Sequence, residues 1–268
     1  MPIPALDSFL PDFTPFTRAL VDAYHAGGLN SWDAAADRVL LYFSPECLLA
    51  FDAVIPGWLD MASYANQQTL IHVSLAFAAL AMLPEYADAP PDQQRMAEWV
   101  VAFHDVTKQP RRGSHDWTHG FRSAGVAGRA LPALGFAARD DLAALDAWAE
   151  MTHAAQTPHP TEDTLMQDNR HLPAILDGLH TLFGQVSPAS QIVKGVLFHM
   201  SIDAVADYPT AAPLRDDEVR SYIDAPTLQL LKMMMLVDCD AWALFDPPLK
   251  ARDRGLVLAE FDRLSALY

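Results

Sequence analysis

Apolar residues recur every three or four positions along most of the chain, whereas strict alternation of apolar and polar residues is scarce. This spacing puts the apolar side chains on one face of an α-helix, and the small number of β-branched residues disfavours strands. The predicted fold class is therefore all-α. The expected helices cover residues 15–26, 31–43, 66–83, 92–106, 117–132, 139–155, 171–184, 188–206, 215–222, 226–245 and 251–266.

Prolines separate these segments, because proline lacks the backbone N–H that a helix interior needs and disfavours helical geometry in the residue before it. Several expected helices also start at residues that favour a helix N-terminus. These are Ser31, Ser187 with Pro188 at the first helical position, and Thr227 after Pro226.

The chain has 268 residues, of which 51% are hydrophobic, so it is long enough and apolar enough to bury a full core. It contains no internal repeat, low-complexity tract or Gly/Ser linker, and the sequence therefore predicts one domain over residues 1–268. The segment 156–225 is rich in proline and charge at both ends. It is interpreted either as an insertion or lid, or as ordinary core.

The formal net charge of −16 excludes a broad surface for nucleic-acid duplexes or anionic membranes, because both need an excess of Lys and Arg. Cys47 and Cys239 lie far apart in apolar surroundings, which favours free thiols and a cytoplasmic location. The first residues lack the pattern of a secretion signal, and the longest apolar run, about 75–83, is too short to span a bilayer.

The most informative motif is His104-Asp105-Val106-Thr107-Lys108, at the end of an apolar helix that Pro110 must stop. An imidazole and a carboxylate side by side can bind a divalent cation, and Lys108 can bind a phosphate next to it. Together with Arg111 and Arg112, Lys108 forms a local basic spot, although an exposed turn would carry the same residues for solubility alone.

Further metal-binding side chains interrupt two other apolar helices. His72 lies among aliphatic residues, where an unpaired polar group costs about 1–3 kcal/mol, so it needs a hydrogen-bond partner or a metal. Asp238 and Asp240 interrupt a late apolar segment. Because residues two apart project about 200° apart on a helix, only one of these two carboxylates is expected to face the site.

The order of His72, His104-Asp105 and a late Asp resembles the H…HD…D pattern of the HD superfamily of metal-dependent phosphohydrolases. The run HDVTK is similar to the HDxxK form found in that family. The sequence CDAWAL resembles the family's final motif, which favours Asp240 over Asp238 as a ligand. The resemblance implies an HD-like helical core over about 66–246, with an N-terminal helical extension over 1–65.

Two more histidines extend the resemblance to family members that bind two metals. His119 opens HGFRSA, which resembles the helix that follows HD in some members, and Thr152-His153 resembles a T-H pair found in several of them. A helix-start His119 and a helix-end His153 are the alternatives without metal. His199 is interpreted mainly as a core residue paired with Asp203. The implied ligands are His72, His104, Asp105, His119, His153 and Asp240.

The resemblance implies a cytoplasmic phosphohydrolase with one or two divalent ions among Mn, Fe, Co, Ni and Zn, whose substrate is a small phosphoester such as a nucleotide. Asp105 and Lys108 are the expected catalytic residues, and Lys108 and Arg112 are expected to bind the phosphate. Two alternatives stay open. One is a di-iron oxygenase, because members of the wider HD fold use a similar ligand set, and the other is a helical binding protein without metal. The run AAQTPHP after His153 argues against a phosphodiesterase of the GYP type.

Overall fold

The computed structural model describes residues 2–63, 67–109, 115–205 and 210–268, and it confirms the all-α fold class. Every expected helix overlaps an observed one. The helices are α1 (Phe13–His25), α2 (Trp32–Tyr42), α3 (Pro45–Val54), α4 (Trp58–Ser63), α5 (Gln68–Ala81), α6 (Pro84–Ala87), α7 (Pro91–Phe103), α8 (His119–Ala130), α9 (Leu142–Ala154), α10 (Leu172–Phe183), α11 (Pro188–Phe198), α12 (Asp216–Tyr222), α13 (Ala225–Trp242) and α14 (Pro247–Ser265), with 3-10 turns η1 (Leu6–Ser8) and η3 (Asn169–His171).

The sequence pattern did not predict the short helices α3, α4 and α6, or a small antiparallel hairpin. The hairpin pairs β1 (Gln156–Pro158) with β2 (Leu165–Gln167), and Gln156 lies opposite Gln167. It occupies the start of the segment 156–225.

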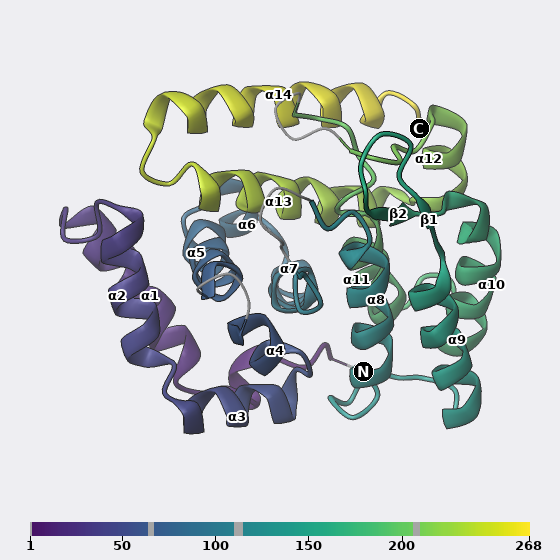
Figure 1. Ribbon diagram of the computed structural model, residues 1–268, viewed down its shortest axis with the longest axis horizontal. Coiled ribbons are helices and arrows are strands. Elements are labelled where there is room, and N and C mark those ends of the chain that lie inside the picture. Colours follow the sequence, from purple (N-terminus) through teal and green to yellow (C-terminus); the bar gives the residue numbers. More distant parts are fainter. Residues whose placement is uncertain (1, 64–66, 110–114, 206–209) are drawn as a thin grey trace.

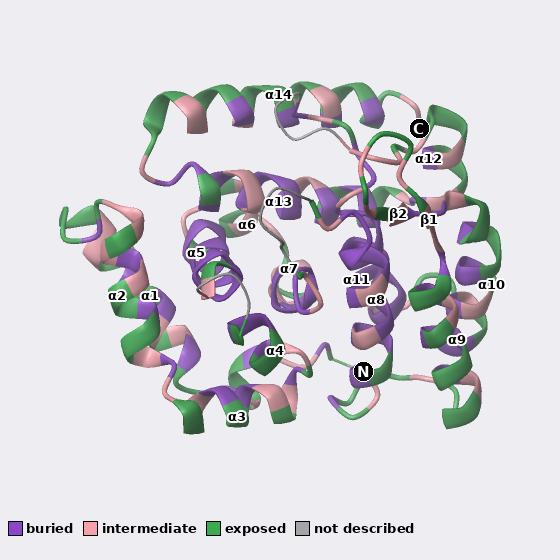
Figure 2. Ribbon diagram, viewed as in Figure 1, coloured by how far each residue is buried: buried purple, intermediate pink, exposed green. Residues whose placement is uncertain are grey.

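The helices form a layered arrangement around α5, α7, α11 and α13 (Figure 1). α5 and α7 are seen almost end-on beneath α13, and α14 lies along the outer side of α13. α8 and α11 continue the core toward α9 and α10, whereas α1 to α4 surround α5 from the other side. Buried residues concentrate on α5, α7, α8, α11 and α13, and the candidate metal-binding side chains lie on these helices or just beyond their ends (Figure 2).

Side chains before the first turn fix the start of several helices by accepting a hydrogen bond from a free backbone N–H. The Oγ of Ser31 accepts from Ala34, and the Oγ of Ser187 accepts from Ser190, so these two predicted caps are confirmed. The prediction for Thr227 was wrong. Asp224 caps α13 by accepting from the Thr227 N–H, because Pro226 already lies in the first turn and Thr227 is buried inside the helix.

α7 ends at Phe103, before the motif residues, and side chains bind its last carbonyl oxygens. The Nδ1–H of His104 donates to Val101, and the indole of Trp58 in α4 donates to Ala102. Asp105 lies in a turn beyond the helix rather than in its last turn. α11 ends in the same way, at Phe198, and the Nδ1–H of His199 donates to Val196.

The segment 156–225 supplies part of the core through α11. Every residue of α11 from Ala189 to Phe198 is buried, and the helix packs against α7, α8 and α13. α11 was expected to continue to residue 206, but it ends early enough to place His199 at its tip. Within the described ranges, no helix is both long enough and apolar enough to cross a membrane.

Candidate metal centre

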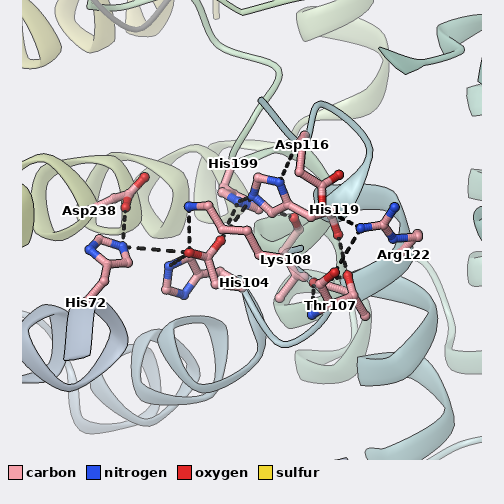
Figure 3. A network of polar contacts seen from close by, with 12 residues as sticks. His72, His104, Thr107, Lys108, Asp116, His119, Arg122, His199 and Asp238 are labelled. Carbon is pink, nitrogen blue, oxygen red and sulfur yellow. Dashed lines mark hydrogen bonds and ion pairs between the residues drawn. The ribbon is translucent and has the colours of Figure 1, made fainter. Parts of the chain in front are cut away.

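Side chains from five elements converge beneath α13 (Figure 3). They come from the middle of α5, the turn after α7, the start of α8, the end of α11 and the last turns of α13. In each of two groups, one potential ligand atom per residue lies within 4.8 Å of the others. These groups are His72, His104 and Asp238, and Asp105, His119 and His199.

The carboxylate of Asp105 lies between the two groups. Its Oδ2 is 3.8 Å from the Nε2 of His72 and 3.6 Å from that of His104, whereas its Oδ1 is 3.0 Å from the Nε2 of His119 and 3.8 Å from that of His199. One oxygen thus faces each group. A carboxylate in this position can bridge two ions.

Three of the histidines direct their Nε2 toward the centre, where the Nε2 atoms of His119 and His199 lie 3.0 Å apart. The Nδ1–H groups of His104, His119 and His199 donate to the backbone carbonyls of the residues three positions earlier, at 2.8, 2.5 and 2.7 Å. A carbonyl can only accept, so the proton of each neutral ring lies on Nδ1. A hydrogen bond of this kind orients a histidine ligand and fixes its tautomer.

The inward-facing atoms satisfy one another only in part. The Nε2 of His72 lies 2.7 Å from the Oδ1 of Asp238, and, against the effect of burial, a hydrogen bond from this ring helps to hold the pKa of Asp238 below its ordinary value. The Nε2 of His104, in contrast, is buried without a hydrogen bond within the described part of the chain. A shared cation would bind all of these atoms, and imidazole and carboxylate groups suit a divalent transition metal.

The charges in the site favour ligands in their metal-binding forms. Burial lowers the pKa of His104 to about 4, although the nearby carboxylates of Asp105 and Asp238 favour its charged form. Burial opposes ionisation of Asp105, but Lys108, His104 and His119 outweigh it and hold the pKa of this carboxyl well below its ordinary value. The site therefore combines a neutral imidazole with an ionised carboxylate at neutral pH.

No family model, curated protein or solved structure matches this chain. The resemblance to the HD superfamily therefore depends on the short motifs and on the side chains that the fold brings together. The structure supports a helical protein with a buried His/Asp cluster that can bind metal, consistent with an HD-like site.

A network behind Asp105 ties its turn to α8. The Oγ1 of Thr107 donates to the carbonyl of His119 and lies 2.9 Å from the Oγ of Ser123, and the Thr107 carbonyl accepts from Arg122 at 2.8 Å. Arg122 also donates to Asp116, whose own carbonyl accepts from the ring of His119. The conformation of the Asp105 turn and the position of His119 are thus fixed together.

Four of the six implied ligands, His72, His104, Asp105 and His119, meet in the cluster, but Asp240 does not. Asp240 is buried on the side of α13 that faces α14, where its Oδ2 lies 3.0 Å from Arg254 and 3.3 Å from Lys250. Asp238 occupies the position in the cluster that was expected for Asp240. Lys250 and Arg254, four residues apart on one face of α14, are the sequence signal for a structural role of Asp240 as their ion-pair partner.

His153 also lies outside the cluster. It is exposed in the last turn of α9, where its partner in the T-H pair, Thr152, is the buried residue. His199 occupies the centre instead, whereas Asp203, with which it was expected to pair, is exposed. The signal for His199 was its place at the end of a segment that is apolar on nearly every face, as for His104.

Of the residues expected to bind phosphate, Lys108 is at the site and Arg112 lies outside the described residues. The Nζ of Lys108 is 2.7 Å from the Oδ2 of Asp105, and about one-fifth of the side chain is exposed. Burial disfavours its charged form, but Asp105 and Asp238 raise the pKa of Lys108 above its ordinary value. Lys108 therefore carries a positive charge beside the cluster.

Asp238→Asn and Asp240→Asn form a matched pair that separates metal binding from stability. We expect Asp238→Asn to reduce the bound metal, because the neutral amide replaces a charged ligand. Asp240→Asn should keep the metal but lower the melting temperature, because Lys250 and Arg254 lose a buried anionic partner. Elemental analysis and thermal unfolding measure the two effects, and metal loss confined to Asp240→Asn would contradict the assignment.

Proposed function

We propose that the protein is a metal-dependent phosphohydrolase that binds two divalent ions and acts on a small phosphoester. The observation that carries this proposal is the position of Asp105, with one carboxylate oxygen toward each group of ligands. His72, His104 and Asp238 would hold one ion, and His119 and His199 would hold the other. The donor set of imidazoles and carboxylates fits Mn, Fe, Co, Ni or Zn.

The bound ions would supply Lewis acidity and a water of lowered pKa near neutral pH. The chain's own residues would orient the reactants. Asp105 would hold the two ligand groups at a fixed distance from each other, because hydrogen bonds of Thr107 with His119 and Arg122 fix the Asp105 turn against α8. The Lys108 ammonium, beside Asp105 and partly open to solvent, would bind a phosphoryl oxygen and stabilise the negative charge that develops there.

The charge of the chain limits the class of substrate. With a formal net charge of −16, long-range attraction would not draw a phosphorylated polymer to this protein. A small phosphoester needs only the local charge of the ions and of Lys108. We therefore propose a small molecule such as a nucleotide, rather than a nucleic-acid duplex or a membrane.

One observation favours a second candidate, a di-iron oxygenase. The group formed by Asp105, His119 and His199 has two imidazoles and one carboxylate, which is the ligand set of many non-haem iron sites that activate dioxygen. The other group adds a similar set across the shared carboxylate. The same residues can thus serve either reaction, and the chemistry must be tested directly.

The test uses the full chain purified without a His-tag and loaded with Mn(II) or Fe(II). We expect about two transition ions per chain and phosphate release from at least one member of a panel of small phosphoesters under strict anaerobiosis. Phosphate release distinguishes the hydrolase because hydrolysis consumes no oxidant. Oxygen consumption coupled to substrate loss, without anaerobic phosphate release, would instead support the oxygenase, and protein without bound metal would contradict both.

A further inference from the structure

His72 differs from the other histidines of the cluster in how its ring is held. His104, His119 and His199 each donate an Nδ1–H to a backbone carbonyl, but the Nδ1 of His72 is buried without a hydrogen bond within the described ranges. The torsion that turns a histidine ring is broad, so it does not fix the ring by itself. Asp238 lies 2.7 Å from the His72 Nε2, but no backbone carbonyl holds the Nδ1 side of this ring, so a further contact must orient it.

The contact that can do so is an aromatic stack. The ring of His72 lies against the indole of Trp242, with centroids 4.4 Å apart and planes 15° from parallel. Trp32, the first residue of α2, covers the other face of this indole at 5.0 Å and 3°. The rings of His72 in α5, Trp242 at the end of α13 and Trp32 at the start of α2 thus form one stack.

The exposure of Trp242 argues against a role in core packing alone. Trp242 remains 41% exposed, although indoles contribute most to stability when they are fully buried. The Nζ of Lys108 lies 5.9 Å from the centre of the same ring. Trp242 thus contacts the candidate ligand His72, lies near the candidate phosphate-binding residue Lys108, and remains partly exposed to solvent.

We propose that Trp242, supported by Trp32, is a positioning residue that orients His72 for metal binding in place of the backbone hydrogen bond that holds the other three histidines. This inference depends on the proposed metal site. It also gives a role to the N-terminal extension, because α2 supplies the outer ring of the stack. The flat face of residue 242 is then the property that matters, more than its volume.

Trp242→Leu and Trp242→Phe separate these two properties, because Leu and Phe are both apolar and smaller than Trp but only Phe has a flat ring. The metal-free full chain of each variant is titrated with Co(II) alone, and the visible absorption of the ion reports its coordination. We expect Trp242→Leu to weaken the binding of one of two ions by about 10- to 100-fold, the range for loss of an outer-shell partner. Trp242→Phe should keep most of the affinity, and Trp32→Ala should have a smaller effect than Trp242→Leu.

Thermal unfolding of the metal-free proteins shows whether the variants fold and whether the effect is only structural. Equal Co(II) affinity for wild type and a folded Trp242→Leu would overturn the inference while leaving the metal site intact. Equal losses for the Leu and Phe variants would also overturn it, because a flat ring would then be irrelevant. A wild-type chain that binds no Co(II) would overturn the metal site and this inference together.

Discussion

Asp105→Ala is expected to lose both ions and all hydrolytic activity. Among the described residues, Asp105 is the one whose carboxylate oxygens face both ligand groups, at 3.0 to 3.8 Å from four imidazole nitrogens. Without it, His119 and His199 keep no carboxylate beside them, and the other group keeps only that of Asp238. Elemental analysis should show the loss of metal, and phosphate release should fall to the background rate. Added Mn(II) should no longer raise the melting temperature, because only binding to the folded state does so.

Two further variants make this result specific. Asp105→Asn keeps the size of the side chain and should fold, but its neutral amide is a poor bridging ligand, so it should lose metal like Asp105→Ala. Asp203→Ala removes an exposed carboxylate near the end of α11 and should keep full metal content. A folded Asp105→Asn that retains two ions and full activity would refute the bridging role.

Much of the fold could be predicted because helical periodicity is a local property of the sequence. Long amphipathic or apolar segments such as α5 and α13 are evident from spacing alone, and the caps at Ser31 and Ser187 follow from residue type. The short helix α6 was missed because it begins at Pro84, which had suggested interruption rather than a helix start.

The site could be predicted only where a ligand has its own local signal. His72 and His104-Asp105 stand out because polar groups interrupt apolar segments, and His119 follows closely in the chain. The choice between Asp238 and Asp240 depends on which side of α13 faces α14, since α13 is buried on most sides and its pattern gives no preferred face. The position of His199 depends on where α11 ends, which the apolar pattern does not show. At this end the His199 ring donates a hydrogen bond to the carbonyl of Val196.

The position of His119 depends in turn on close packing between α8 and α9. The indole of Trp148 in α9 is held by a hydrogen bond from its Nε1 to the carbonyl of Ile175, at 2.8 Å. A Cβ at Gly128 would lie 2.3 Å from this ring, and one at Gly178 in α10 would lie 2.6 Å from it. Because glycines on two helices enclose the ring, it cannot move aside for an added methyl group.

Gly128→Ala is therefore expected to destabilise the protein by about 2 kcal/mol, since overpacking costs up to about 3 kcal/mol and alanine regains only about 1 kcal/mol in a helix. Gly255→Ala is the matched control. Gly255 lies exposed inside α14, and a Cβ there would meet nothing within 4 Å, so this variant should gain about 1 kcal/mol. Urea unfolding measures both free energies. Changes of the same sign would contradict the proposed packing, because the opposite signs arise only from the contact with Trp148.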